Sequence, residues 1–267
     1  MKLDSLHIYP IKSSRGVDLT QSLLKPRGLE FDRRWMLVDQ QGGFISQRSH
    51  RKLAQLCVKP TDYGVVIDLG HIELSVHRPM GERVEVTVWK STLRAPVADA
   101  QTNKVLSDWL GVDVRLVYMD EAAHRPTSSD WAAGHETSFS DGYPVLVTNT
   151  ASLRVLNDYI EAQGHAPISM ARFRPNVVVD TNEPFREDHW KRLKIGETEL
   201  ELVKPCTRCI VTTLDPKTGD VNPEPVMEAL RKFRMSEDPR NKGVLFGVNA
   251  VVRKGGMLSV NMPVQVT

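Results

Sequence analysis

Residues 204–213 read Lys204-Pro205-Cys206-Thr207-Arg208-Cys209-Ile210-Val211-Thr212-Thr213 and hold two of the three cysteines in this chain of 267 residues. Lys204 and Arg208 lie beside the two thiols, and fixed positive charge favours the thiolate, the form that binds metals or attacks electrophiles. The residues after Cys209 are β-branched, which predicts a strand that starts at the cysteines. This combination of charge and sulfur indicates a functional site.

Four interpretations of the cysteine pair stay open on these residues alone. Free cysteines are often small buried core residues. A structural zinc site needs four Cys or His ligands at short spacings, and no second C-x-x-C or H-x-x-x-H is present. A thioredoxin-like dithiol places its first cysteine at a helix start, which the β-branched run disfavours. The fourth is one thiolate ligand to a soft metal carried by an anionic cofactor, and it predicts phosphate-binding residues elsewhere in the chain.

The composition is that of a soluble globular protein, with 40% apolar and 25% charged residues. The net charge of +2 is too small to attract nucleic acid or an anionic membrane, so we expect neither as a partner. No apolar run is long enough for a membrane span, and residues 1–5 contain no signal-peptide core. An odd cysteine count without a secretory signal predicts a cytoplasmic protein.

A short basic loop near the N-terminus is a candidate phosphate site. Lys12 and Ser13 lie between Pro10 and Gly16, which mark a turn-rich loop. Backbone N–H groups, Ser and Lys on such a loop suit an anion. A solvated surface loop is the simpler explanation of this segment taken alone.

Two further segments carry arginines that could bind an anion. Arg33 and Arg34 alternate along a predicted strand, so one of them faces inward. It then needs an anionic partner, either the neighbouring Asp32 or a bound phosphate. Arg174 precedes Pro175, which favours an extended backbone for the arginine. Arginine is the better residue for bidentate phosphate contacts.

Hydrophobic patterning predicts many short strands and few helices. We expect helices over 100–110, after the capping pair Thr148 and Asn149, and over 227–233. Alternating or β-branched runs predict strands at 3–11, around 35–37, and at 44–48, 53–58, 65–69, 72–76, 84–89, 114–118, 145–147, 177–179, 193–195, 199–203, 210–214, 244–252 and 257–266.

These elements predict a mainly β (α+β) fold without βαβ repetition, built from two consecutive β-barrel-like units with a few short helices. The polar stretch 120–143 is too long for an ordinary connection and is the candidate boundary. It divides the chain into units 1–120 and 121–267.

Five short motifs occur in order along the chain: Tyr9-Pro10-Ile11-Lys12-Ser13, Asp32-Arg33-Arg34-Trp35, Phe173-Arg174-Pro175-Asn176, Pro205-Cys206-Thr207-Arg208-Cys209 and Leu245-Phe246-Gly247. Together they resemble the MOSC-domain proteins, in particular the amidoxime-reducing branch that includes the mitochondrial amidoxime-reducing component and its bacterial relatives. The resemblance covers nearly the whole chain. It implies an N-terminal MOSC β-barrel domain followed by a MOSC domain.

The resemblance implies a molybdenum cofactor (Mo-molybdopterin) bound through one thiolate, at the position of Cys209, with Cys206 as the fallback ligand. The positions that match cofactor contacts are Lys12, Ser13, Arg33, Asp141, Arg174, Asn176, Thr207 and Arg208. The family reduces small N-hydroxylated substrates such as amidoximes, hydroxylamines and N-hydroxylated bases, so the same reaction is implied here. A pterin dithiolene and one protein thiolate form a soft ligand set, and the protein binds, orients and tunes it.

The electrons are expected from a separate protein. The chain has neither a G-x-G-x-x-G nucleotide fingerprint nor the C-x₄-C-x₂-C spacing of the iron–sulfur domain that some bacterial relatives append. The resemblance implies a ferredoxin-like, flavoprotein or cytochrome-reductase donor. Mitochondrial members carry an N-terminal targeting and membrane segment, whereas this sequence starts at its first predicted strand, so we expect no membrane association.

Two other functions stay open from the sequence, and a monomer is the expected state. A molybdenum-cofactor or sulfur carrier would work through a persulfide on Cys206 or Cys209. A dithiol redox protein would need a reversible disulfide between the same two residues.

Overall fold

The centre of the larger sheet is a pair of long antiparallel strands, β15 (Thr198–Thr207) and β16 (Leu245–Lys254). The computed structural model describes residues 1–267. Eight strands form this sheet, in the order β18 (Val264–Val266), β14 (Arg192–Ile195), β15, β16, β12 (Val145–Asn149), β13 (Val177–Asp180), β1 (Lys2–Ile8) and β2 (Val17–Leu19).

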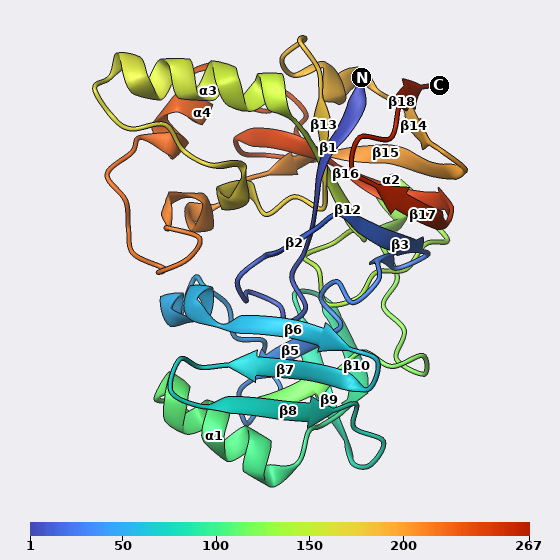
Figure 1. Cartoon of the computed structure of the whole chain (residues 1–267), viewed down its shortest axis with the longest axis vertical. Coiled ribbons are helices and arrows are strands. Elements are labelled where there is room, and N and C mark those ends of the chain that lie inside the picture. The colour runs from blue at the N-terminus through green and yellow to red at the C-terminus, as the bar shows by residue number, and fades with distance from the viewer.

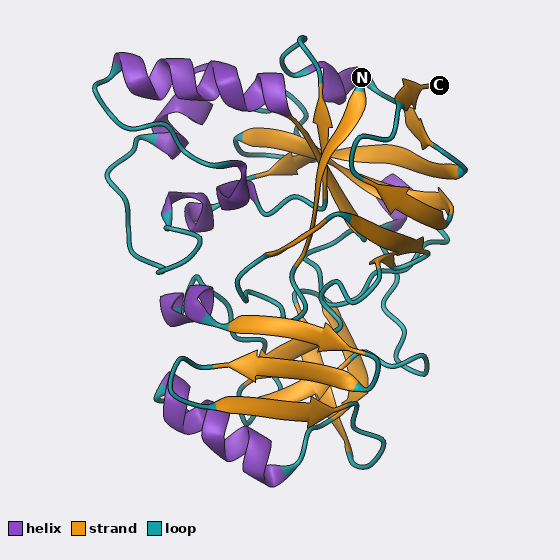
Figure 2. Ribbon diagram, in the orientation of Figure 1, coloured by secondary structure: helices purple, strands orange, loops and turns teal.

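The large sheet, a second sheet of three strands and several helices form the upper body of the molecule in Figure 1. The small sheet has the order β17 (Gly256–Ser259), β3 (Gln21–Lys25) and β4 (Gly28–Leu29). The helices α3 (Thr150–Ala162) and α4 (Val226–Phe233) lie together at one side of the large sheet. Figure 2 shows the remaining helical turns of this body: α2 (Ser129–Ala132) and the 3₁₀ turns η2 (Met170–Phe173), η3 (Arg186–His189) and η4 (Ile210–Thr213).

The lower body in Figure 1 is built from residues between the first strands and the loop at 120. Three small sheets form it, with helix α1 (Ala100–Leu110) across their outer side. The sheets pair β5 (Trp35–Val38) with β11 (Arg115–Tyr118), β9 (Arg83–Val88) with β10 (Ser91–Pro96), and β6 (Cys57–Thr61) with β7 (Gly64–Asp68) and β8 (Glu73–His77). A 3₁₀ turn, η1 (Arg51–Gln55), precedes β6.

Each body has a hydrophobic core of its own. Seventeen buried residues, among them Leu3 and Leu200, fill the upper one, and seventeen others, among them Leu53 and Leu116, fill the lower one. Complete burial of one such side chain stabilises the fold by roughly 1.5–3 kcal/mol. Three smaller clusters complete the packing, among them one around Val86 and Phe139 and one around Leu156 and Phe246.

Local signals account for both long helices. The Asn149 side chain accepts a hydrogen bond from the Ala151 backbone N–H at 2.8 Å and so caps α3, as predicted. Helix α1 ends at Gly111, whose φ of +81° lies in the left-handed region that glycine adopts without steric cost. The prediction of a helix over 100–110 is confirmed.

The strand predicted after Cys209 is wrong, since residues 210–213 form η4. The ladder between β15 and β16 ends at Thr207 and Leu245, so the following residues have no partner strand. The hydroxyl of Thr212 instead donates to the Cys209 carbonyl at 3.0 Å, a local hydrogen bond that competes with strand formation. The cysteines therefore lie at the end of a strand, not at its start.

Other element predictions also need correction: the strand expected over 257–266 is divided into β17 and β18, and strands β2, β3 and β4 were not expected. Residues 51–55 form η1, so the strand expected at 53–58 starts only at Cys57. Phe44 makes a single bridge to Val38, and 44–48 is not a strand. Strand β10 was not expected, because charged and polar residues interrupt its apolar positions.

The mainly β, α+β class is confirmed, but the sheets are open and do not close into barrels. One βαβ unit exists, because β12 and β13 run parallel and α3 joins them. The boundary at 120 and 121 stays a prediction, and β1 to β4 lie with the strands of the C-terminal half. None of the helices is both long and apolar enough to cross a membrane.

Candidate functional site

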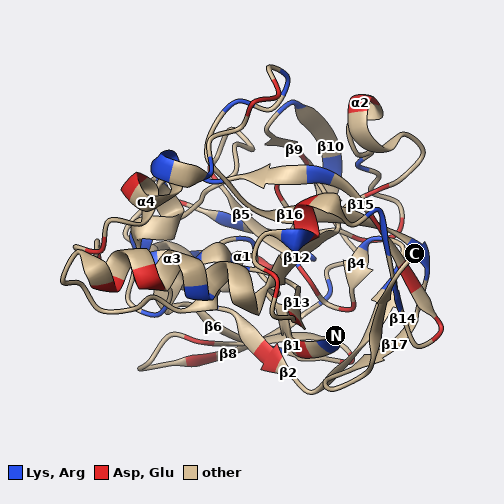
Figure 3. Cartoon of the chain, turned by 90° about the horizontal axis from the view of Figure 1, so that it is seen from above, with Lys and Arg blue, Asp and Glu red and all other residues tan.

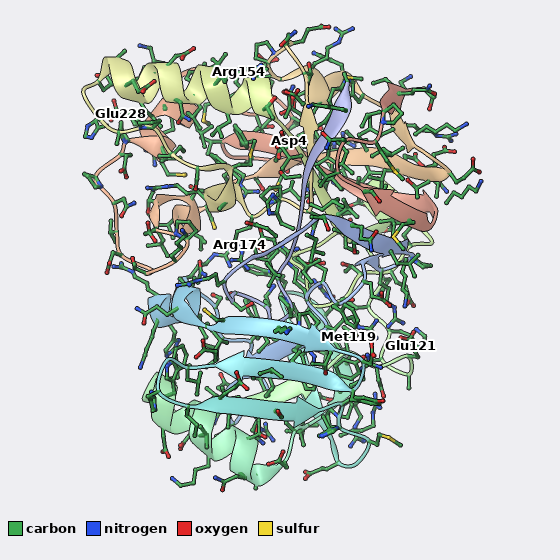
Figure 4. All side chains as sticks on the ribbon, viewed as in Figure 1. Asp4, Met119, Glu121, Arg154, Arg174 and Glu228 are labelled. Carbon is green, nitrogen blue, oxygen red and sulfur yellow. The ribbon has the colours of Figure 1, made fainter.

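The predicted site residues meet in one hollow between the two bodies, which has a volume of about 770 Å³, part of it open to solvent. Figure 4 shows Arg174 at this level, below the large sheet and above η1. The predicted residues that line the hollow are Lys12, Ser13, Arg33, Asp141, Arg174, Asn176, Cys206, Arg208 and Cys209. Thr207 does not line it and is exposed, because neighbouring side chains on a strand point to opposite faces.

Both cysteines of the pair are free thiols, and each accepts a hydrogen bond from an arginine. Arg48 Nη2 donates to Cys209 Sγ at 3.2 Å. Arg208 Nη1 donates to Cys206 Sγ at 2.9 Å. Each sulfur therefore lies within hydrogen-bonding distance of a fixed positive charge.

Arg33 is held in place from three directions. Its Nη1 donates to Asp32 Oδ2 at 2.6 Å and to Asn176 Oδ1 at 3.2 Å, and its Nη2 donates to the Arg174 carbonyl at 3.2 Å. Burial lowers the pKa of Arg33, but the Asp32 carboxylate raises it, and the net direction is upward. Asp32 is thus a partner of Arg33, as one interpretation expected, while the arginine also lines the hollow. Arg34 faces away and binds the Met119 carbonyl at 2.8 Å.

Arg174 has an unused donor. Its Nη1 donates to the Ser14 carbonyl at 2.8 Å, whereas its Nη2 is buried without a hydrogen-bond partner. Its guanidinium lies 4.0 Å from the centre of the Tyr9 ring. Burial lowers the pKa of Arg174 to about 10. A buried, unpaired cationic donor is costly, so this atom indicates a place for an anion.

Three non-glycine residues of the site have left-handed backbones. The φ values are +70° for Ser13, +48° for Arg33 and +53° for Arg174. The extended backbone expected for Arg174 is therefore wrong: the residue ends η2 in the left-handed region despite the following Pro175. Such conformations cost of order 1–3 kcal/mol each and concentrate at functional sites.

Lys12 is almost completely buried at the back of the hollow. Its Nζ donates to the Phe139 carbonyl at 2.8 Å and to Asp141 Oδ1 at 2.6 Å. Burial lowers the pKa of Lys12 to about 8, although the Asp141 carboxylate opposes this shift. Arg48 also approaches Asp141, at 3.7 Å. Cations thus outnumber carboxylates around the hollow, which suits an anionic ligand.

The positive character is local to the hollow. Figure 3 shows Lys and Arg positions scattered along the ribbon among Asp and Glu positions, without a face of one sign. No group of three or more His, Cys, Asp or Glu residues is arranged to hold a metal ion. Protein side chains alone therefore supply no closed ligand set, and Cys209 could serve as one ligand among others from a bound group.

Sequence reasoning missed Arg48, Gln47 and Arg125. Gln47 Nε2 donates to the Ser13 carbonyl at 2.8 Å and ties the lower body to the basic loop. Arg125 is buried and donates to the carbonyls of Ser138 and Ser140, and at 3.0 Å to that of Asp141. Only the length of the loop 120–143 pointed toward Arg125. Nothing in the sequence pairs residues 47 and 48 with the cysteines.

Replacing Arg125 by alanine is expected to lower the free energy of unfolding by about 3 kcal/mol, because three carbonyls lose a charged donor. Urea unfolding followed by circular dichroism measures this change. Arg231→Ala, at an exposed position on α4, is the control and should change stability by less than about 0.5 kcal/mol. Equal stability of the two variants would contradict the role of Arg125 in holding 138–141.

Two family models match the chain: the MOSC N-terminal beta barrel domain over residues 1–113 and the MOSC domain over residues 134–265. The chain belongs to the MOSC-domain family. This MOSC-domain chain is 27% identical to "Mitochondrial amidoxime-reducing component 1" of Danio rerio, over 97% of the chain and 82% of the relative. It is 28% identical to "Mitochondrial amidoxime reducing component 2" of Rattus norvegicus, over 96% and 80%. The human component 1 is 27% identical over 97% and 81%.

The comparisons confirm the resemblance to the amidoxime-reducing branch. The names of these relatives describe them as amidoxime-reducing components. The roles of single residues in this MOSC-domain chain stay predictions.

Proposed function

We propose that the hollow binds a molybdenum cofactor through the Cys209 thiolate and that the protein reduces N-hydroxylated compounds. The observation that carries this proposal is the convergence of one thiol with cations from distant parts of the chain. Cys209, Arg174, Arg33 and Lys12 line the same hollow, although residues 12 and 209 lie at opposite ends of the sequence.

The residues present fit such a group. The free Nη2 of Arg174 and the buried Nζ of Lys12 provide donors for a phosphate. Cys209 Sγ provides a soft ligand beside them, and Arg48 Nη2 contacts this sulfur at 3.2 Å.

Each side chain has a separate task in this proposal. When bound, the cofactor would supply the two-electron chemistry that cleaves an N–O bond. Arg33 and Arg174 hold the anionic end, and the Arg33 bonds to Asp32 and Asn176 fix the orientation of that guanidinium. Arg48 orients the Cys209 sulfur through its hydrogen bond.

We propose that the electrons come from a separate protein, because the sequence contains neither a nucleotide fingerprint nor an iron–sulfur cysteine pattern. We propose a ferredoxin-like protein, a flavoprotein or a cytochrome reductase in this role. We propose the cytoplasm as the location because all three cysteines are free thiols, which suits a reducing compartment. We also propose that the protein is a monomer. Cell fractionation and light scattering test the last two points.

The test of the proposed function is to purify the protein and measure molybdenum, pterin and reduction of benzamidoxime with a chemically reduced dye. We expect stoichiometric molybdenum and pterin, and benzamidine as the product. Protein that lacks both groups after expression in a host that makes the cofactor, and that does not reduce benzamidoxime, would reject the proposal.

A carrier function is the second candidate, because Cys206 also faces the hollow and receives the Arg208 donor at 2.9 Å. In that case the working species would be a persulfide on Cys206 or Cys209. Sulfur that is released by cyanide, without bound pterin, would support the carrier. Pterin without such sulfur would support the reductase.

The low pKa of Lys12 predicts a pH dependence of cofactor retention. Lys12 is charged below about pH 8 and becomes neutral as pH rises through this value, so the hollow loses one cation facing the anion. Retention should fall above about pH 8, by up to roughly tenfold in affinity per pH unit. Pterin that remains after dialysis at neutral and at alkaline pH measures this effect. Lys12→Arg should flatten the dependence, and an equally steep profile in that variant would contradict the assignment to Lys12.

A further inference from the structure

Trp89 occupies an unusual place at the tip of a hairpin in the lower body. Strands β9 and β10 pair from Val88 and Ser91, which leaves Trp89 and Lys90 as a two-residue turn. The φ of Trp89 is +57°, in the left-handed region that Gly, Asn and Asp usually fill in such turns. A bulky aromatic residue in this conformation is strained, and strain of this kind concentrates at functional sites.

Three side chains hold the indole, which is still partly exposed. Its ring centre lies 5.0 Å from that of Phe44 and 4.8 Å from the Arg48 guanidinium. Its Nε1 donates to Asp141 Oδ1 at 3.4 Å. Even so, 47% of the residue is exposed to solvent. Trp89 is therefore a fixed aromatic surface and not a loose side chain.

The indole contacts two residues that line the hollow, Arg48 and Asp141, while Trp89 itself is not a lining residue. Arg48 contacts the indole and also donates to Cys209 Sγ, so one guanidinium separates the ring from the sulfur. The hairpin is tied to the Arg48 loop, because the Thr87 N–H donates to the Gly42 carbonyl at 2.9 Å. A Cβ at Gly42 would lie 2.3 Å from the Glu85 carbonyl oxygen, so the loop packs directly on β9. The position of the indole relative to the sulfur is thus set by the fold.

We propose that Trp89 is a specificity-determining residue on which the flat part of the substrate stacks, so that planar aromatic N-hydroxylated compounds are preferred over aliphatic ones. This inference rests on the proposed function and names the substrate class at the same site. Aromatic faces attract other flat π-systems without requiring a particular hydrogen-bond pattern. One such contact changes affinity by about tenfold.

The test compares benzamidoxime with acetamidoxime, its small aliphatic counterpart, in wild type, Trp89→Ala and Trp89→Phe. Binding is measured by calorimetry without a reductant, so no turnover is needed. We expect Trp89→Ala to weaken benzamidoxime binding about tenfold and to change acetamidoxime binding less than about twofold. Trp89→Phe keeps a ring but loses the N–H to Asp141, and it should bind benzamidoxime within about threefold of wild type. With reductant present, the loss in Trp89→Ala should appear in KM more than in kcat.

Tyr63→Ala is the matched control, because Tyr63 is an exposed aromatic residue in the turn between β6 and β7 and, unlike Trp89, makes no hydrogen bond or cation–π contact with Arg48 or Asp141. It should leave both ligands unaffected, and all variants should retain wild-type molybdenum. Equal losses for both ligands in Trp89→Ala, no loss for either, or a phenylalanine variant as weak as the alanine one would overturn the inference. Preferential binding of benzamidoxime without any reduction would reject the proposed reaction but would still support Trp89 as the stacking surface.

Discussion

Cys209→Ser is expected to lose bound molybdenum and all reduction of benzamidoxime, while the fold stays intact. A serine hydroxyl is not ionised at neutral pH and is a poor ligand for a soft metal, so it cannot replace the thiolate. The change removes no packing volume of consequence, and Oγ can still accept the Arg48 hydrogen bond. The free energy of unfolding of the apoprotein should therefore change by less than about 0.5 kcal/mol. Elemental analysis, pterin fluorescence and urea unfolding on the same preparations measure these quantities.

The other two cysteines are the controls for this experiment. Cys206→Ser changes a thiol that lines the same hollow, and Cys57→Ser changes one that does not. Both should keep wild-type molybdenum. Molybdenum retained in Cys209→Ser but lost in Cys206→Ser would move the ligand assignment to the fallback cysteine. Molybdenum retained in both variants would reject a cysteine ligand from this pair.

The sequence was informative where side chains carry the chemistry. Lys12, Arg33, Arg174 and Cys209 belong to short motifs, and the fold brings all four motifs to one hollow. Helix ends were also predictable, because Asn149 caps α3 through a hydrogen bond with Ala151, which is only two residues away in the sequence. Motif residues and caps depend on neighbouring positions, which a sequence displays directly.

Contacts between the two bodies could not be predicted in the same way. Arg48 and Trp89 reach the sulfur region from a loop and a hairpin tip, and neither has a local pattern that points to Cys209. The strand predicted at 210–214 failed for a related reason. β-branched residues favour a strand only where a partner strand exists, and β16 ends its pairing at Leu245. Arg174 was predicted to be extended, but η2 and the carbonyl contact with Arg33 hold it in a left-handed conformation.

Arg174→Met should release the cofactor without weakening the protein. The variant loses the donors that face the anion, which should cost about 3 kcal/mol of cofactor binding, or roughly a hundredfold in affinity. The apoprotein, however, no longer buries a guanidinium whose Nη2 lacks a partner. Its free energy of unfolding should therefore stay within about 1 kcal/mol of the wild-type value or exceed it. Pterin retained after dialysis and urea unfolding of cofactor-free protein measure the two effects separately.

Arg172→Met provides the matched control two residues away. Arg172 is more deeply buried than Arg174, and its Nη1 also lacks a hydrogen-bond partner, but it forms an ion pair with Glu224 at 3.0 Å and does not line the hollow. Removing the Arg172 guanidinium leaves the Glu224 carboxylate without its ion-pair partner, so the free energy of unfolding of the apoprotein should fall by about 3–5 kcal/mol. The folded fraction should still bind cofactor. We thus expect Arg174→Met to lose cofactor and keep its stability, whereas Arg172→Met should lose stability and keep cofactor binding. These opposite results distinguish a binding role from a structural role. If Arg174→Met were as unstable as Arg172→Met and still retained pterin, Arg174 would be a structural residue, and the anion would have to be held elsewhere.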